Sequence, residues 1–284
     1  MNLLVDVGNS RIKWAFQYEG RVSVGTSTDY DRLDFAALAH NTWDQMEIPK
    51  RVLVSNVAGG GLKEQLSAWV SRRWRIGAEF LLAEKQAFGV TNAYTDPERL
   101  GADRWACLLA AHDQITGPVC IVDCGTAITI DVLSETGQHM GGLILPGIQT
   151  MQQSLVNNTA QIFAESMEQY IGPLQLGRST LQAVENGCFF SAVATIERVV
   201  GKVTEDFGTV VATVITGGDA DRIVPLLKIP PPSRVAVLPV TVTLVSVAEP
   251  PLWLKIPAPR ALAVFPVIVL FTSVSVPLLK MPPP

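Results

Sequence analysis

A strand that ends in an Asp-x-Gly turn occurs twice in this chain, about one domain length apart. Residues 3–10 read LLVDVGNS and residues 120–127 read CIVDCGTA, so that Asp6 and Asp123 occupy equivalent positions. In both copies a glycine stands two residues after the aspartate, a small polar residue follows, and a second apolar run comes next. Two equivalent β-hairpins predict a duplicated fold whose ligand lies between the two halves.

The residues of the first turn indicate what that ligand is. Gly8 has no Cβ, so the backbone N–H groups of the turn can approach an anion closely. The Asp6 carboxylate would repel such an anion unless a divalent cation lay between them, and the turn therefore predicts a site for a metal-bound polyphosphate. A single copy does not separate this site from an ordinary hairpin, because Asp-x-Gly is common in turns. The repetition favours the binding site.

Between the two hairpins, strand patterns alternate with helix patterns. Residues 51–57, RVLVSNV, predict a buried strand, and Leu62, Leu66 and Val70 share one face of a following helix. Residues 79–82 predict a further strand. This alternation indicates an α/β fold with mixed sheets.

Residues 94–111, YTDPERLGADRWACLLAA, combine a helix pattern with charged residues. The helix is predicted to begin near Gly101, which places Asp103 and Arg104 in its first turn. Asp103 alone could be a carboxylate that stabilises the positive end of the helix dipole. Arg104 gains nothing from that position, and a carboxylate beside a guanidinium suits a substrate that carries both a hydroxyl and a carboxylate group.

A second long helix is predicted after LGRST, residues 176–180. Ser179 or Thr180 is a suitable N-cap, because its hydroxyl can accept a hydrogen bond from a free N–H of the first turn. Thr180 is thus a helix cap by default, and a ligand contact only if other residues of a site surround it.

Composition restricts the class of protein. The chain has 284 residues and a net charge of −4, and 48% of its residues are hydrophobic. This length and hydrophobic content are sufficient for two domains with their own cores. The mild acidity argues against nucleic acid as the main partner, since phosphate backbones require a basic surface. Met1 and Asn2 lead directly into a strand pattern, without the basic segment of a secretory signal.

The four cysteines lie in strand or helix patterns and not at zinc-binding spacings; they are Cys107, Cys120, Cys124 and Cys188. Cys120 and Cys124 bracket the second turn, so metal binding is conceivable there, but buried free thiols are the commoner arrangement. Free thiols indicate a reduced, cytoplasmic protein.

The chain changes character after about Ile223. Fourteen of the 19 prolines lie in residues 225–284, and no glycine follows Gly218. Proline removes backbone donors and breaks helices and central strands, and no proline-free run there reaches the length of about 18 residues that a membrane span needs. Residues 230–284 are therefore predicted to form an atypical Pro/Val-rich tail that packs poorly and takes no part in catalysis, and we expect no membrane partner.

Six short motifs, taken in order, resemble those of the type III pantothenate kinases, a family of the actin-like ATPase and sugar kinase superfamily. They are DVGNSRIK from Asp6, LGADR from Leu100, DCGTAIT from Asp123, GGLILPG from Gly141, LGRST from Leu176 and TGGDA from Thr216, so the similarity covers roughly residues 1–222. The resemblance implies two ribonuclease-H-like domains with the nucleotide in the cleft between them, which agrees with the duplication. We assign residues 1–117 and 118–229 to these domains.

The resemblance also implies an activity and its cofactors. The reaction would be ATP-dependent phosphorylation of pantothenate to 4'-phosphopantothenate, the first step of coenzyme A synthesis. ATP would bind with Mg²⁺, a monovalent cation (K⁺ or NH₄⁺) would be required, and the protein would be a homodimer.

Roles follow by resemblance for the residues that match the family motifs. The ATP phosphates would be bound by Asp6, Val7, Gly8, Asn9, Ser10, Arg11, Ile12, Lys13 and Thr126, with Mg²⁺ near Asp6. Pantothenate would be held by Tyr94, Gly101, Ala102, Asp103, Arg104 and Thr180. Asp103 would be the general base on the pantothenate hydroxyl, and Asp123 would bind the monovalent cation.

Two other functions fit the same motifs. A nucleotide-binding regulator of the same fold, acting as a transcription accessory factor, would bind ATP without turnover. A superfamily kinase could also act on another small alcohol or acid. Asp103 together with Arg104 favours an enzyme over a regulator, because a regulator has no use for a base.

Overall fold

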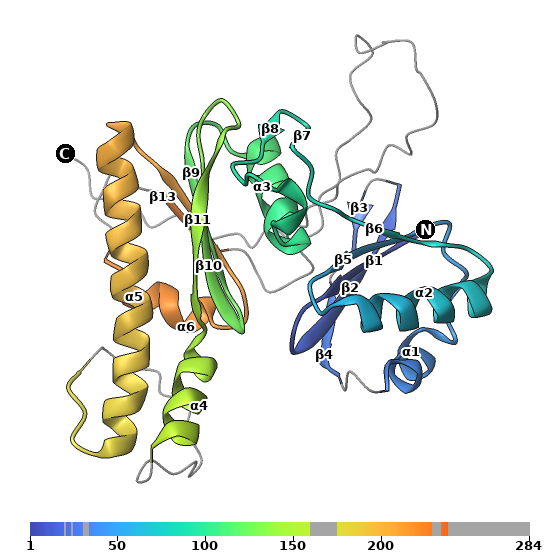
Figure 1. Ribbon diagram of the computed structural model, residues 1–284, viewed down its shortest axis with the longest axis horizontal. Coiled ribbons are helices and arrows are strands. Elements are labelled where there is room, and N and C mark those ends of the chain that lie inside the picture. The colour runs from blue at the N-terminus through green and yellow to red at the C-terminus, as the bar shows by residue number, and fades with distance from the viewer. Residues whose placement is uncertain (20, 24, 31–33, 160–174, 229–233, 238–284) are drawn as a thin grey trace, which may run out of the picture.

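The computed structural model describes residues 1–19, 21–23, 25–30, 34–159, 175–228 and 234–237. In this part of the chain two mixed β-sheets stand side by side, and helix α3 (Ala102–Gln114) lies between them (Figure 1). The α/β architecture expected from the alternating patterns is confirmed.

The first sheet has the order β3-β2-β1-β5-β6, and β4 also pairs with β2. Its strands are β1 (Asn2–Val7), β2 (Arg11–Tyr18), β3 (Arg21–Val22), β4 (Thr26–Asp29), β5 (Val52–Asn56) and β6 (Ala78–Phe80). Helices α1 (Phe35–Trp43) and α2 (Gly60–Trp74) pack on this sheet and share one apolar core with it. Phe35, Trp43 and Leu66 lie at the centre of that core, which fixes β1 and its turn on a rigid support.

The second sheet has the order β11-β10-β9-β12-β13. Its strands are β9 (Val119–Cys124), β10 (Ala127–Leu133), β11 (His139–Pro146), β12 (Ala212–Thr216) and β13 (Arg234–Val237). In the first sheet, β1 pairs antiparallel with β2 and parallel with β5. In the second, β9 pairs antiparallel with β10 and parallel with β12. The two sheets thus repeat one topology, as the recurring Asp-x-Gly turn predicts.

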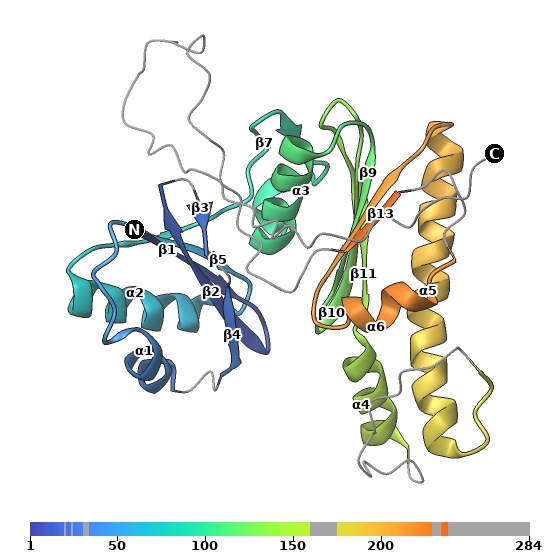
Figure 2. The same cartoon turned by 180° about the vertical axis from the view of Figure 1, so that it is seen from behind.

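Helices cover both faces of the second sheet. On one face lies α5 (Thr180–Phe207), with α4 (Ile148–Asn158) beside it, and on the other lies α3 (Figure 2). Separate apolar clusters fill the two interfaces, one around Phe189 and Ile196 of α5 and one around Trp105 and Leu108 of α3. The first turn of α3 is therefore held against the sheet that carries the second hairpin.

Short elements complete the described chain: β7 (Gln86–Ala87), β8 (Val90–Thr91), α6 (Ala220–Ile223) and the 3-10 turns η1 (Pro97–Arg99) and η2 (Val224–Leu226). All four cysteines are buried and free, as predicted from their positions in strand and helix patterns. The helices described here include none with the length and apolar character that crossing a bilayer requires.

One part of the proline-rich tail has regular structure. Residues 234–237 form β13, which pairs with β12 in parallel and extends the second sheet by one strand. Arg234–Val237 contains no proline or other residue that blocks strand pairing. The rest of the predicted tail, 230–233 and 238–284, lies outside the described residues.

Candidate functional site

The turns of the two equivalent hairpins face each other. Ser10, which precedes β2, and Thr126, which precedes β10, lie 116 residues apart in the sequence, yet their hydroxyl oxygens are 3.0 Å apart. Each turn is closed by the N–H of its glycine: Gly8 donates to the Arg11 carbonyl, three residues on, and Gly125 donates to the Ala127 carbonyl, two residues on. The two copies of the repeated motif therefore meet at one place.

The space beside the second turn is left open by the protein itself. A Cβ built on Gly125 would make only ordinary contacts, 3.5 Å from the Ala127 carbonyl oxygen and 3.7 Å from Asp123 Oδ1. The protein interior therefore does not require glycine at this position. A glycine that packing does not require is consistent with a turn whose backbone a ligand approaches.

Oppositely charged side chains lie directly behind the first turn. Asp6 and Lys13 are partners in the β1–β2 register, and Lys13 Nζ is 3.4 Å from Asp6 Oδ2. Burial lowers the pKa of Lys13, but the negative charges of Asp6 and Asp123 outweigh burial and leave the pKa raised. Lys13 is therefore a permanent cation at the junction of the two hairpins, where a phosphate charge could be neutralised.

Asp103 lies in the first turn of α3, close to these charges. Burial, followed by the negative charges of Asp6 and Asp123, raises the pKa of Asp103 to about 6, although the Arg104 backbone N–H donates to its carboxylate at 2.7 Å. A Cβ on Gly101 would lie 2.6 Å from Asp103 Oδ1, so glycine at this position leaves room for the carboxylate. A carboxylate with a pKa just below neutrality is suited to general base catalysis.

Asp123 lies at the end of β9, opposite Thr129 of β10 and Thr216 of β12. Burial and the charge of Asp6 raise the pKa of its carboxyl group, and Lys13 opposes them. Lys13 acts on Asp6 and Asp123, whereas the positive charge that acts on Asp103 is Arg104, which is itself paired with Asp131. Asp6, Asp103 and Asp123 therefore share little positive charge, and bound cations would balance the excess of negative charge.

These carboxylates fit cations that bring other ligands with them. No group of three or more His, Cys, Asp or Glu side chains in the described residues is arranged to hold a metal ion by itself. Mg²⁺ commonly binds through one or two carboxylates and completes its shell with water and substrate phosphate oxygens. The carboxylate oxygens of Asp6 and Asp123 agree with that type of site.

A buried polar network extends from Arg104 into the second sheet. Arg104 Nε and Nη2 donate to both carboxylate oxygens of Asp131 at 2.7 and 2.6 Å, and Nη1 donates to the Tyr94 hydroxyl at 2.8 Å. His139 Nε2 lies 2.9 Å from Asp131 Oδ1. Tyr94, Gly101, Asp103 and Arg104 are thus brought together as predicted. Asp131 and His139 were not predicted, although an aspartate within the apolar run ITIDVL signals a buried partner.

Three predicted site residues point their side chains into the core. Val7, Ile12 and Ala102 are buried among apolar neighbours, so they could contribute only backbone groups to a ligand. Arg11 instead pairs with Asp29 at the surface, with Nε 2.9 Å from Oδ1. The candidate phosphate contacts of the first turn are therefore its backbone groups, the Ser10 hydroxyl and the Lys13 ammonium.

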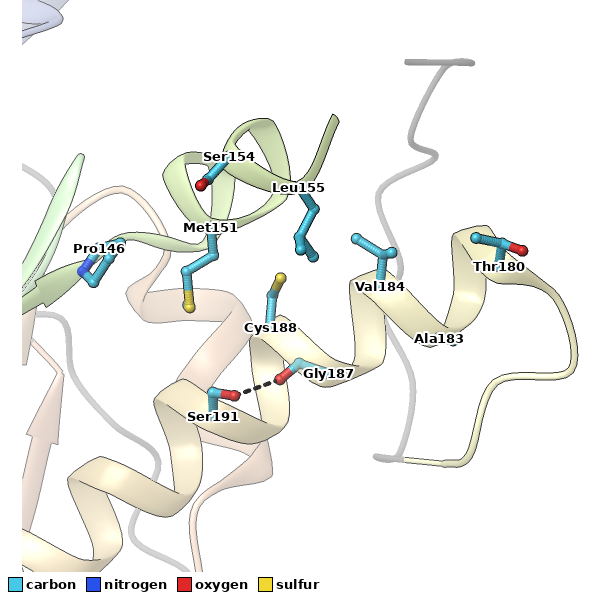
Figure 3. Close-up of a pocket in the computed structure, with 10 residues that line it drawn as sticks. All are labelled: Pro146, Met151, Ser154, Leu155, Thr180, Ala183, Val184, Gly187, Cys188 and Ser191. Carbon is cyan, nitrogen blue, oxygen red and sulfur yellow. Dashed lines mark hydrogen bonds between the residues drawn. The ribbon is translucent and has the colours of Figure 1, made fainter. Parts of the chain in front are cut away.

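Thr180 lies apart from the other predicted residues. It begins α5 and lines an open groove of about 650 Å³ between α4 and α5, with Met151, Leu155, Val184 and other small or apolar residues (Figure 3). Helix α5 is on the face of the second sheet opposite α3, which carries Asp103 and Arg104 (Figures 1 and 2). Ser179, and not Thr180, is the N-cap, and its hydroxyl accepts from Gln182 N–H at 3.2 Å.

Comparison with known proteins agrees with this geometry. The profile of the type III pantothenate kinase family matches residues 2–202. A type III pantothenate kinase from Nitrosococcus oceani is 41% identical over 235 residues, which is 80% of this chain and 87% of that protein. A second, from Nitrosospira multiformis, is 34% identical and covers 80% of this chain and 84% of its own length.

A solved structure supports the fold. A protein from Sinorhizobium meliloti described as a 2-dehydro-3-deoxygalactonokinase has a TM-score of 0.50 and 13% identity, and the match covers 84% of this chain and 91% of that one. This likeness concerns the fold alone. The family profile spans both hairpins and α3, and the relatives match over most of their length. This chain belongs to the type III pantothenate kinase family.

Proposed function

We propose that this protein transfers the γ-phosphoryl group of ATP to the hydroxyl group of pantothenate, which gives 4'-phosphopantothenate, the first step of coenzyme A synthesis. The observation that carries the proposal is the meeting of two glycine turns beside Asp103, a carboxylate whose pKa is raised to about 6. Phosphoryl transfer depends mainly on positioning and charge neutralisation, together with one group that accepts the hydroxyl proton.

The residues divide this work between them. Backbone N–H groups of the turns at Gly8 and Gly125, with the Ser10 and Thr126 hydroxyls, would bind the phosphates, and Lys13 would neutralise part of their charge. Asp103 would hold the hydroxyl group of pantothenate and take its proton, since a carboxylate of pKa about 6 is ionised near neutral pH. Mg²⁺, held near Asp6, would supply further neutralisation of phosphate charge.

The pantothenate site would lie next to Asp103. Gly101 and Ala102 provide backbone at the start of α3, and Tyr94 and Arg104 lie beside them, joined by a hydrogen bond. Arg104 would bind the carboxylate of pantothenate while Asp103 binds its hydroxyl. The neighbouring positions of base and guanidinium at the start of one helix thus match the two polar groups of this substrate.

A monovalent cation, K⁺ or NH₄⁺, would bind at Asp123. The residue is partly buried, desolvation and then the negative charge of Asp6 raise the pKa of its carboxyl group, and none of the described residues donates a hydrogen bond to that group. An ionised carboxylate in such a place needs a counter-ion, and Lys13 is already paired with Asp6.

A homodimer would explain the position of Thr180. In one chain α5, which Thr180 begins, is on the face of the second sheet opposite α3, which carries Asp103 (Figure 1). A role in pantothenate binding therefore requires that Thr180 reach the site of the partner. Exposed apolar side chains on β11 and α5, including Ile144 and Phe190, offer surface for such an interface. We further propose a cytoplasmic location, supported by the four buried free thiols.

We retain the proposed domain limits, 1–117 and 118–229. The repeated strand topology supports two units. Helix α3 precedes the limit in sequence but packs on β9 and β10 as well as on β5, so it joins the two units while it presents Asp103 between them.

The proposal is tested by coupled measurement of ADP release with and without pantothenate. Release that requires pantothenate, and that disappears in Asp103→Asn, supports it. ATP binding without ADP release for any acceptor would identify the nucleotide-binding regulator instead. Release that requires a different small alcohol or acid, and not pantothenate, would identify a kinase of another specificity. The raised pKa of Asp103 favours the enzyme, because a site that only binds nucleotide does not need a base.

A further inference from the structure

The guanidinium group of Arg104 is held from the second sheet, across the boundary between a helix and a strand. Asp131 lies on β10 and receives two nearly equal hydrogen bonds from Arg104, at 2.7 and 2.6 Å. Both side chains are almost fully buried, with 6% of Arg104 and 2% of Asp131 exposed. A bidentate pair of this kind fixes the plane of the guanidinium as well as its position.

Asp131 is in turn held by His139, the first residue of β11. The Ala93 N–H lies 3.4 Å from His139 Nδ1, which makes Nδ1 the acceptor. The neutral ring then carries its proton on Nε2, and this N–H donates to Asp131 Oδ1 at 2.9 Å. The ring also stacks on Tyr94, with 6.2 Å between centroids and 14° between planes. Asp131 therefore has little freedom to follow Arg104 if the latter moves.

The opposite strand leaves room for this pair. Gly142 of β11 is the register partner of Asp131. A Cβ on Gly142 would lie 2.3 Å from Asp131 Oδ1 and 2.6 Å from Arg104 Nη2, closer than any side chain could be accommodated without movement. The ion pair, together with the Ile130 carbonyl oxygen at 2.4 Å, thus occupies the space that a side chain at position 142 would fill.

The network leaves part of Arg104 available. A guanidinium has five N–H donors, and the described residues use one each on Nε, Nη2 and Nη1. One N–H therefore remains on each terminal nitrogen, and two donors on adjacent nitrogens match the two oxygens of a carboxylate. The direction in which these donors point is set by the bonds to Asp131.

We infer that Asp131 is a positioning residue for substrate binding: it fixes the orientation in which Arg104 presents its two remaining N–H groups to the carboxylate of pantothenate. The inference rests on the proposed function, in which Arg104 binds that carboxylate. His139 supports Asp131 at Oδ1, the oxygen that also accepts from Arg104 Nη2. Asp131 itself touches neither substrate nor the reacting atoms.

The direction in which the KM for pantothenate changes distinguishes this positioning role from a simple effect of charge. Asp131→Asn keeps the size of the side chain and removes its negative charge. If Asp131 merely weakened the positive charge of Arg104, the variant would bind pantothenate more tightly and its KM would fall. If Asp131 orients Arg104, the KM for pantothenate rises, because the guanidinium is no longer held by two charge-assisted hydrogen bonds.

The experiment compares steady-state kinetics of wild type, Asp131→Asn and Glu79→Gln, each with its thermal unfolding curve. Glu79→Gln is the matched control, because Arg51 donates to Glu79 with the same bidentate distances, 2.7 and 2.6 Å, in the first sheet. For Asp131→Asn we expect the KM for pantothenate to rise about tenfold or more, with kcat within about threefold and the KM for ATP within about twofold. Glu79→Gln should leave all three constants unchanged while it lowers the unfolding temperature.

An unchanged or lower KM for pantothenate in folded Asp131→Asn overturns the inference, as does a fall confined to kcat. If Asp131→Asn shows no cooperative unfolding transition, His139→Phe tests the positioning role instead. This variant keeps an aromatic ring stacked on Tyr94 and removes the hydrogen-bond donor to Asp131. A rise of about threefold in the KM for pantothenate then supports the role, and no rise overturns it. Arg104→Lys distinguishes the proposed substrate contact of Arg104 from the positioning role of Asp131. If it leaves this KM unchanged, the proposed substrate contact of Arg104 fails. If it raises this KM and Asp131→Asn does not, only the positioning role fails.

Discussion

The hydroxyl oxygens of Ser10 and Thr126 lie 3.0 Å apart and join the turns of two hairpins that belong to different sheets. The contact is exposed, so it contributes little to stability by itself. Its position matters more, because it marks the point at which the two turns meet. A phosphate group that enters there can accept hydrogen bonds from both hydroxyls in place of their bond to each other.

Thr126→Ala should therefore weaken ATP binding. We expect the KM for ATP to rise about three- to tenfold, the worth of one hydrogen bond, with the KM for pantothenate unchanged. Thr136→Ala is the control, since this threonine lies in the β10–β11 turn and bonds to Ser134. Equal KM values for ATP in Thr126→Ala and wild type would show that the Thr126 hydroxyl does not contact ATP.

Asp103→Asn should abolish most of the turnover. The amide keeps the size of the side chain but cannot accept the hydroxyl proton, so kcat should fall by about 10²- to 10⁴-fold, while ATP binding, measured by titration, is retained. Asp113→Asn near the end of the same helix changes an exposed carboxylate and serves as the control. A kcat within a few fold of wild type would exclude Asp103 as the base.

The pH profile offers a second test of the same group. Burial and the charges of Asp6 and Asp123 raise the pKa of Asp103 to about 6, and only the ionised form can act as a base. We expect kcat/KM for pantothenate to fall tenfold for each pH unit below about pH 6, as protonation removes the base. A profile that stays flat down to pH 5 would contradict this assignment.

The raised pKa also has a consequence for stability. The folded protein binds the Asp103 proton more tightly than the unfolded chain, whose pKa is near the ordinary 3.8. Folding stability therefore falls as the pH rises from about 4 to about 6, and above that range the ionised group destabilises the folded state. Asp103→Asn removes this effect and should be more stable than wild type by about 1–3 kcal/mol at pH 8.

Urea unfolding of both proteins at pH 5 and pH 8 measures the difference. The gain in the free energy of unfolding should be larger at pH 8 than at pH 5, where wild type is mostly protonated at Asp103. The same gain at both pH values would mean that ionisation of Asp103 does not destabilise the fold. Asp113→Asn, which changes an exposed carboxylate, should show no such dependence.

The elements that sequence predicted best are those whose signal is local. The two Asp-x-Gly turns, the start of α3 at Ala102 and the strand β5 within residues 51–57 follow from patterns a few residues long. Strand ends were less accurate, since β6 covers Ala78–Phe80 where residues 79–82 were expected. Packing against β5 decides where this short strand stops.

Long-range pairing accounts for what sequence did not predict. Asp131, the partner of Arg104, is 27 residues away in the sequence, and neither Asp131 nor His139 belongs to a motif that indicates this pairing. Likewise, Val7 and Ile12 lie in the motif that is expected to bind phosphate, but strand alternation turns their side chains into the core. A motif therefore indicates which residues belong to a candidate site without showing which atoms of each residue face it.

The last prediction concerns the cation at Asp123. This residue is partly buried, it lies near Asp6, and none of the described residues donates a hydrogen bond to its carboxyl group. A bound K⁺ or NH₄⁺ would offset the repulsion between the carboxylates and keep Asp123 ionised. The rate should therefore rise with K⁺ to a plateau when choline chloride holds the ionic strength constant, and it should remain low with Na⁺. Asp123→Asn keeps the shape and one oxygen but removes the charge, so the K⁺ concentration at half-maximal rate should increase about tenfold. Equal rates for wild type in K⁺, Na⁺ and choline would show that no monovalent cation acts at this site. A normal K⁺ dependence in Asp123→Asn would place the cation elsewhere.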